Sequence, residues 1–189
     1  MTDKDMFAER GRSLEEEYFR KKDKELIEKM RKAAESDRSR AEMGSRLGLT
    51  DPEMLKELDG LGFTPDTVAL LPLMPAIQVA WAEGGVSDAE RHLLVKLARA
   101  RGISDGSAAD RQLAAWLDRR PADHVFANAT RLIRAMIDPP GGSSLTADDL
   151  VKQAESIAAA SGGMLGIIGR VSAEERQLLT SLAEQLKAR

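Results

Sequence analysis

The pattern of hydrophobic and polar positions divides the chain near residue 47. Residues 1–46 are dominated by charged side chains and hold few large apolar ones. Most of the Leu, Ile, Val and Ala residues lie between about residue 65 and the C-terminus. The pattern therefore predicts three parts: a charged helix over residues 1–46, a linker with a short helix over 47–64, and a compact helical domain over 65–189.

The charged segment reads as one long helix. Ser13 followed by Glu16 fits a capping box, and no proline or glycine lies between Leu14 and Met43. Opposite charges recur at helical spacing, which stabilises an exposed helix by about 0.2–0.5 kcal/mol per pair. The apolar residues form only a thin, broken stripe, whereas a helix packed in a globular domain shows a wider band. We therefore expect this helix to project, at least in part, from the rest of the chain.

The apolar part of the chain predicts helices and no strands, because no segment shows sustained alternation of apolar and polar residues. Pro72 and Pro75 interrupt the apolar stretch 67–82, so a kink or break is expected there. The other expected helices span residues 52–58, 87–101, 107–117, 121–137, 146–160 and 172–188. The predicted fold class is all-α.

A weak internal repeat connects two of these helices. The sequence VSDAERHLLVKLA begins at Val86, and VSAEERQLLTSLA begins at Val171. Both segments open a capped helix, which favours a duplicated helical unit and hence a pseudo-duplicated core. The alternative is that capping boxes in front of apolar runs resemble one another by chance.

Composition excludes several classes of protein. The net charge is only −3 and the two signs are interspersed, which argues against a general nucleic-acid binder. The chain has no cysteine, so neither disulfides nor thiolate zinc sites can form. It shows no apolar run of a secretory signal and none near the roughly 20 residues that cross a bilayer. These features predict a soluble cytoplasmic protein without direct membrane insertion.

The sequence offers no recognisable active site. The two histidines, His92 and His124, lie in no metal-binding or triad spacing. The glycine-rich stretches PPGGSS and SGGMLGIIG lack the terminal Gly-Lys-Ser/Thr of a phosphate loop. The side chains of Glu15, Glu16 and Glu17 fan outward from a helix and do not converge as an acid/base pair. We therefore expect no enzyme activity and no cofactor.

One resemblance concerns the second half of the chain. Residues 78–103, QVAWAEGGVSDAERHLLVKLARARGI, are similar to the tellurite-resistance TerB-like family, in which an apolar helix ends in Ala and an acidic-Gly pair before a capped helix. The residues from Ala82 to Val86 take the place of the more usual Ala-Asp-Gly pattern. Over residues 66–188, the resemblance implies a compact TerB-like all-α domain with a pseudo-duplicated core, which serves as a sensing or docking module.

Some TerB-like proteins carry acidic metal sites, and the corresponding candidates here are Glu83, Asp88 and Glu90. Glu90 is already explained as the second half of a capping box with Ser87. Asp88 suits the first turn of a helix, where the helix dipole favours negative charge. We therefore predict no metal site.

A second resemblance concerns the charged helix. Residues 7–30 resemble the inhibitory segment of the mitochondrial ATPase inhibitor protein, and the bacterial zeta-type ATPase inhibitor has a related opening. The matching residues are, in register and without a gap, Phe7, Arg10, Glu15, Glu16, Tyr18, Phe19, Arg20 and Glu25. Two features depart from that family: Gly11 replaces a usual acidic residue, and the histidine-rich coiled coil with its pH-dependent oligomer switch is missing.

The resemblance implies that the helix enters a cleft between the alpha and beta subunits of the rotary ATP synthase and blocks ATP hydrolysis by stopping the rotor subunit gamma. Tyr18 and Phe19 would be buried anchors, Glu15 would pair with an arginine, and Arg20 with an acidic group. Phe7 and Arg10 would lie deepest, toward the rotor. The residues expected to contact the partner are Phe7, Arg10, Leu14, Glu15, Glu16, Tyr18, Phe19, Arg20, Leu26, Ile27 and Met30.

Three alternatives stay open for the charged helix. It is a solvated helix with Tyr18 and Phe19 packed on the globular domain, or it lies on a membrane surface, which the equal mix of acidic and basic residues disfavours. The third alternative is a TerB-like stress-response or scaffold module whose helix binds another protein or a second copy, giving a homodimer. As an inhibitor, the cytoplasmic protein would associate peripherally with the membrane-bound ATP synthase.

Overall fold

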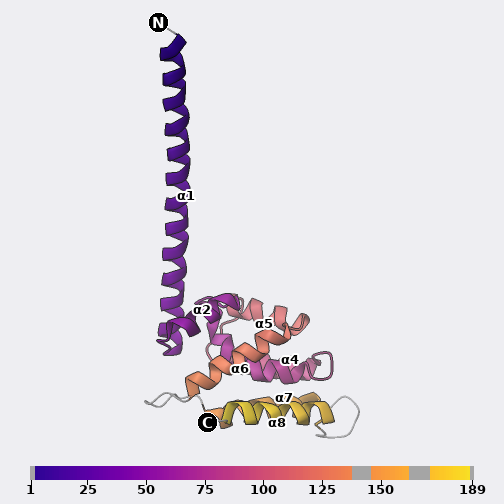
Figure 1. Cartoon of the computed structure of the whole chain (residues 1–189). Coiled ribbons are helices and arrows are strands. Elements are labelled where there is room, and N and C mark those ends of the chain that lie inside the picture. The colour runs from indigo at the N-terminus through magenta and orange to yellow at the C-terminus, as the bar shows by residue number, and fades with distance from the viewer. Residues whose placement is uncertain (1–2, 138–145, 162–170, 188–189) are drawn as a thin grey trace.

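A computed structural model describes residues 3–137, 146–161 and 171–187, with side chains for 15–137, 146–160 and 171–187. All regular elements within these ranges are helices. The first, α1 (Asp3–Leu47), projects from a compact helical body formed by the rest of the described chain (Figure 1). The all-α fold with a long projecting N-terminal helix is therefore confirmed.

The body contains the helices that the sequence predicts, within a few residues at each end. They are α2 (Pro52–Gly60), the 3₁₀ helix η1 (Val68–Leu73), α3 (Met74–Ala80), α4 (Asp88–Ala100), α5 (Ala108–Asp118), α6 (Asp123–Ile137), α7 (Ala147–Ser161) and α8 (Ala173–Lys187). The break expected in residues 67–82 is the junction of η1, which contains Pro72, with α3, which has Pro75 in its first turn. The glycine-rich stretch PPGGSS, residues 139–144, lies outside the described residues.

The start of α1 corrects one prediction. Ser13 and Glu16 resemble a capping box, yet α1 begins at Asp3 and continues through Gly11 and Ser13. Ser13 is therefore an interior helix residue and no N-cap. A glycine inside a helix costs about 1 kcal/mol relative to alanine, which a helix of this length tolerates when good helix formers flank it.

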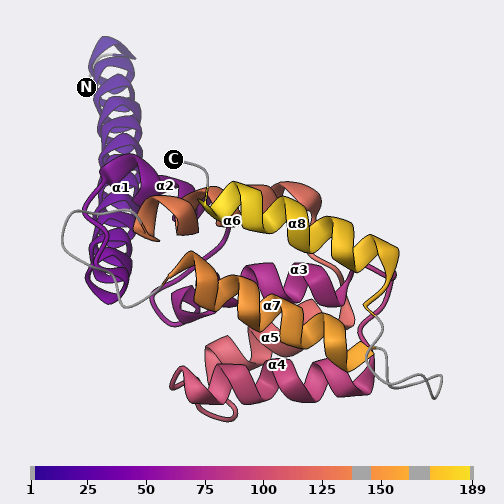
Figure 2. The ribbon, with the colours of Figure 1, turned by 90° about the horizontal axis from the view of Figure 1, so that it is seen from below.

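The core of the body surrounds α3. This short helix is apolar on every side, and all of its residues except Gln78 are buried. The helix α7 packs along α3 and against α4, while α8 packs against α6 and α7 (Figure 2). In Figure 1, α7 and α8 lie at the end of the body farthest from the tip of α1, whereas α2 lies beside the end of α1 that joins the body.

The last turns of α1 belong to the body. Met43 is fully buried, and the Ser36 hydroxyl donates a hydrogen bond to the Asp59 carboxylate at 2.9 Å. A side-chain nitrogen of Arg46 lies 3.5 Å from the Asp66 carboxylate. We call residues 36–47 the base of α1. The base is fixed by contacts with α2 and the turn that follows it, so α1 leaves the body in a defined direction.

Candidate protein-binding helix

The projecting part of α1 presents large apolar side chains to solvent. Tyr18, Phe19, Leu26, Ile27 and Met30 are 57%, 62%, 57%, 50% and 63% exposed, and they are the large hydrophobic residues that stand exposed among the described side chains. Single exposed apolar residues are ordinary, but five within thirteen positions of one unpacked helix mark a contact surface. We call residues 18–30 the apolar segment.

The apolar segment surrounds about half of the helix. At about 100° per residue, Phe19, Leu26 and Met30 fall within about 40° of one another on a single line. Tyr18 lies about 100° to one side of Phe19, and Ile27 lies about 80° to the other side. The side chains of Tyr18 and Ile27 therefore leave the helix in opposite directions, and no single flat surface can cover both.

Tyr18 and Phe19 form one aromatic surface. Their ring centroids are 5.9 Å apart, and the rings meet edge to face at 73°. The ammonium group of Lys22 lies 5.8 Å from the centroid of the Tyr18 ring. Neither ring packs on the body, because both are more than half exposed. The alternative in which these two residues pack on the globular domain is therefore wrong.

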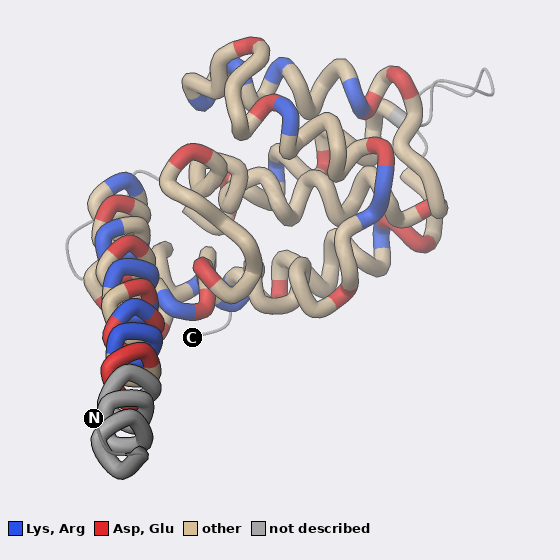
Figure 3. The backbone as a smooth tube through the Cα atoms, turned by 90° about the horizontal axis from the view of Figure 1, so that it is seen from above, with Lys and Arg blue, Asp and Glu red and all other residues tan. Residues whose placement is uncertain are grey.

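Charged side chains surround the apolar ones in the described, exposed part of α1. Lys and Arg alternate with Asp and Glu along the helix in Figure 3, and the pairing is local. Arg20 lies 3.4 Å from Glu16, and Lys22 lies 3.7 Å from Glu25. Such exposed pairs contribute only about 0.2–0.5 kcal/mol each, so a partner can replace them at small cost. Glu15 is exposed as well.

Three predicted contact residues lie beyond this description. Phe7, Arg10 and Leu14 belong to α1, but their side chains are outside the described ones. The described residues of the predicted set, Glu15, Glu16, Tyr18, Phe19, Arg20, Leu26, Ile27 and Met30, all lie on the exposed part of α1.

One of the acidic candidates for a metal site, Glu90, has a structural role in the start of α4. Glu90 is buried, and its carboxylate accepts hydrogen bonds from the backbone N–H and the hydroxyl of Ser87, both at 2.7 Å. Ser87 in turn accepts from the backbone N–H of Glu90 at 3.3 Å, which completes the capping box of α4. Among the described residues, no group of three or more His, Asp or Glu could hold a metal ion, and Glu83 and Asp88 are no exception.

Burial also raises the pKa of Glu90. Removal from water raises the pKa of Glu90 above its ordinary value, while the hydrogen bonds from Ser87 oppose the rise and the nearby carboxylate of Glu175 adds to it. Glu175 is the corresponding residue of the second repeat. It is buried too, and its carboxylate accepts from the Ser172 backbone N–H at 2.8 Å.

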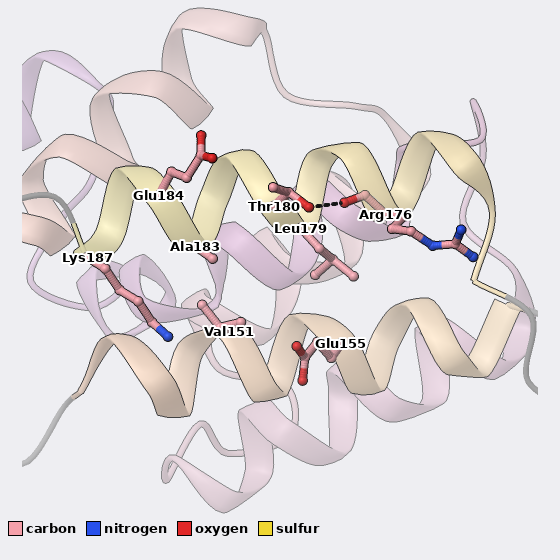
Figure 4. A pocket seen from close by; sticks show the side chains of 8 residues that line it. All are labelled: Val151, Glu155, Arg176, Leu179, Thr180, Ala183, Glu184 and Lys187. Atoms are coloured by element: carbon pink, nitrogen blue, oxygen red, sulfur yellow. Dashed lines mark hydrogen bonds between the residues drawn. The ribbon is translucent and has the colours of Figure 1, made fainter.

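A shallow groove lies between α7 and α8 (Figure 4). Its floor is apolar, formed by Val151, Leu179 and Ala183, and charged residues of both signs, including Glu155 and Lys187, border it. A groove of this kind can seat one side of a helix, but the mixed charges along its edges favour no particular class of ligand.

Comparison of the chain with protein-family models, curated proteins and solved structures gives no match. The two resemblances drawn from residues 7–30 and 66–188 therefore stay predictions. Within the described ranges, no helix has the length and apolar character needed to span a membrane.

Sequence reasoning missed the base of α1. In the sequence, Met43 looks like an ordinary helix end and Gly44 looks like the start of a junction between elements. Both residues are buried where α1 meets the body. A weak signal was present, because Met43 is the one large apolar residue between Met30 and Leu47 in a highly charged segment. The helix α1, however, packs against α2 and η1, which no local pattern connects to α1.

Proposed function

We propose that this chain inhibits ATP hydrolysis by the rotary ATP synthase, with α1 inserted between the alpha and beta subunits and directed at the rotor subunit gamma. One observation carries the proposal: α1 projects from the body with exposed apolar side chains around half of its circumference. The choice of partner rests on a resemblance to the inhibitory segment of the ATPase inhibitor protein. The residues in register with that segment include Glu15, Glu16, Tyr18, Phe19 and Arg20.

The distribution of the apolar side chains favours a cleft over other partners. A membrane surface or a second helix in a coiled coil covers one stripe, such as Phe19, Leu26 and Met30. Tyr18 and Ile27 point in opposite directions, so burial of both requires walls on at least two sides. A cleft between two subunits provides such walls. It also removes Tyr18 and Phe19 from water, and aromatic side chains in desolvated pockets are typical hot spots of protein interfaces.

The inhibitor would act by occupying space, with no chemistry of its own. Tyr18 and Phe19 supply apolar contact area at low cost in side-chain entropy, because each has only two rotatable side-chain bonds. Glu15 and Arg20 pair with charges on the cleft walls, fix the register of the helix and speed the encounter. A helix held in the cleft prevents the rotor from completing a hydrolytic turn.

For the part of the body within residues 65–189 we propose a TerB-like domain with a pseudo-duplicated core that presents the helix. The two capping boxes support the duplication. Ser87 with Glu90 and Ser172 with Glu175 make equivalent hydrogen bonds at the starts of α4 and α8, and both glutamates are buried. Chance similarity of two surface caps would not place both glutamates in the interior. In this proposal the protein is cytoplasmic and associates peripherally with the catalytic head of the membrane-bound synthase.

The test is ATP hydrolysis by the purified synthase of the source organism, titrated with the full-length chain. We expect inhibition that Tyr18→Ala and Phe19→Ala each weaken by about 30-fold, the effect of losing about 2 kcal/mol of binding at a hot spot. Lys24→Ala is the matched control, because Lys24 is exposed on the polar side of the same helix. This variant should inhibit as strongly as the wild type. Absence of inhibition by micromolar wild-type protein would refute the proposal.

The second candidate function is a scaffold module whose α1 binds a different protein or a second copy. The exposed line of Phe19, Leu26 and Met30 favours it, since one stripe suffices for a two-helix contact. This candidate predicts a concentration-dependent dimer that Leu26→Glu dissolves, measured by analytical ultracentrifugation. A monomer at all concentrations, together with inhibition of the synthase, would exclude the self-association form.

A further inference from the structure

The distance between the apolar segment and the base of α1 is short. Among the described side chains of α1, Met30 is the last large apolar one that is exposed, and Ser36 is the first that is hydrogen-bonded to the body. They are six positions apart in the helix, which corresponds to about 9 Å along the axis. A helix packed across Met30 is itself about 10–12 Å wide and extends about 5–6 Å beyond it, so a protein wall that covers Met30 ends about 3–4 Å from the level of Ser36, within reach of side chains of the body.

The connection between helix and body is stiff. The helix α1 continues without interruption from the apolar segment into the base, where Met43 is fully buried. Gly44 lies so close to its neighbours that an added Cβ would be 2.6 Å from the Leu49 carbonyl oxygen. Arg40 lies near Asp59 as well, with a nitrogen–oxygen distance of 4.0 Å. The body therefore cannot swing aside as it would on a flexible linker.

From these two observations we infer that the body itself forms part of the binding surface, and that the side of the body around α2 contacts the protein that receives α1. This inference rests on the proposed function. The partner is the protein whose cleft holds the apolar segment, and α2 meets its outer surface next to the cleft mouth. Contact at α2 limits how deep α1 enters and fixes its rotation, which preorganises the helix for binding.

The first test changes the rotation between α1 and the body. Two alanines inserted between Lys32 and Ala33 turn the body by about 200° around the helix and move it by about 3 Å. Seven inserted residues with the same helix propensity turn it by only about 20°, although they withdraw it by about 10 Å. Both insertions lie in the exposed part of α1, so the melting temperature of the body should not change.

We expect the two-residue insertion to raise the concentration for half-maximal inhibition at least tenfold, because the body is turned into the partner or away from it. The seven-residue insertion should be less damaging, because it removes the contact without a clash. Equal inhibition by the wild type and the two-residue variant would overturn the inference while leaving the proposed function intact. Failure of the wild type to inhibit would instead refute the proposed function.

The second test locates the contact directly. The chain has no cysteine, so Glu53→Cys on α2 carries one thiol for a photo-cross-linker. Glu174→Cys is the matched control, because Glu174 is likewise an exposed acidic residue in the first turn of a helix, but on α8. We expect cross-links to the alpha or beta subunit from position 53 and none from 174. An inhibited complex without cross-links from position 53, or with equal yields from both, would overturn the inference.

Discussion

At the scale of single residues, Glu90 and Gly44 are each unfavourable in one respect: Glu90 is a buried carboxylate, and Gly44 is a glycine inside a helix. Glu90 places a carboxylate in the interior because it completes the capping box of α4, and its raised pKa records the loss of hydration. Gly44 gives up helix propensity so that α1 can approach the following turn closely, where the Leu49 backbone N–H donates to the Gly44 carbonyl at 2.9 Å. Each position makes a prediction.

Replacement of Glu90 should change how stability depends on pH. Because the folded pKa is raised, the folded chain binds the proton more tightly than the unfolded chain, whose pKa is near 4.5. The contribution of Glu90 to the free energy of unfolding is therefore fully present below pH 4.5 and is lost as pH rises through the folded pKa. Glu90→Gln should retain the cap and remove this loss, as measured by urea denaturation between pH 4 and pH 8.

Glu90→Ala serves as the comparison, because it removes the charge together with the carboxylate that accepts from the Ser87 backbone N–H, while the Ser87 hydroxyl can still accept from the backbone N–H of residue 90. It should lower the free energy of unfolding by about 0.5–1.5 kcal/mol, the usual net contribution of one hydrogen bond. Identical pH profiles for the wild type and Glu90→Gln would show that the buried carboxylate does not titrate as described.

Gly44→Ala should destabilise the junction of α1 with the body. The new Cβ would meet the Leu49 carbonyl oxygen at 2.6 Å and Leu55 at 3.2 Å, so backbone must move, at a cost of about 1–3 kcal/mol. Gly60→Ala is the control, because nothing lies within 4 Å of its added Cβ. A lower melting temperature for Gly44→Ala alone is the expected result, and equal melting temperatures would contradict the close approach.

At the scale of elements, α1 divides into two parts with different stability. Residues 15–35 are exposed along their whole length and rely on local ion pairs such as Lys32 with Glu28 at 3.0 Å. An isolated helix is marginal in water, because most helical stability in proteins comes from tertiary packing. The base, by contrast, shares its packing with α2 and η1.

Hydrogen exchange should resolve this boundary. We expect amides of residues 15–35 to exchange orders of magnitude faster than those of the base, and those of α3 to exchange most slowly, because α3 lies in the core. Peptide-resolved mass spectrometry of the full-length chain measures all three regions at once. In the proposed complex with the ATP synthase, the apolar segment should become protected. Slow exchange of residues 15–35 in the free chain would contradict an unpacked helix.

At the scale of the whole molecule, the chain is a rod attached to a globule. The 45 residues of α1 extend about 67 Å, whereas a compact chain of 189 residues has a radius of gyration of about 16 Å. In the proposed inhibitory role, a molecule of this shape needs no conformational change to expose its helix, so its association rate should be limited by encounter and charge steering.

Small-angle X-ray scattering of the free chain tests this shape. We expect a radius of gyration clearly above 16 Å and a distance distribution with a long tail, both independent of concentration for a monomer. Gly44→Ala, which disturbs the base, should broaden the tail if it loosens the direction of α1. A radius of gyration near 16 Å would mean that α1 folds back onto the body.

Particular residues explain how much could be predicted. Ser87 and Glu90 fixed the start of α4 from sequence because a capping box is a local motif, and Pro72 with Pro75 marked the break before α3 for the same reason. Ser13 misled, since the same motif occurs inside a helix when the preceding residues are also good helix formers. The exposure of Tyr18 and Phe19 followed from the absence of a continuous apolar stripe around them.

The sequence by itself determined the helices, their approximate ends and the polar character of the N-terminal segment, because these depend on spacing and caps within a few neighbouring residues. Only the tertiary structure decided the hydrogen bond between Ser36 and Asp59 and the burial of Met43, which fix the direction of α1. It also decided the burial of Glu90 together with Glu175 and the distance between the apolar segment and the body. These features join residues far apart in the chain, and no local pattern of side chains specifies which distant surfaces meet.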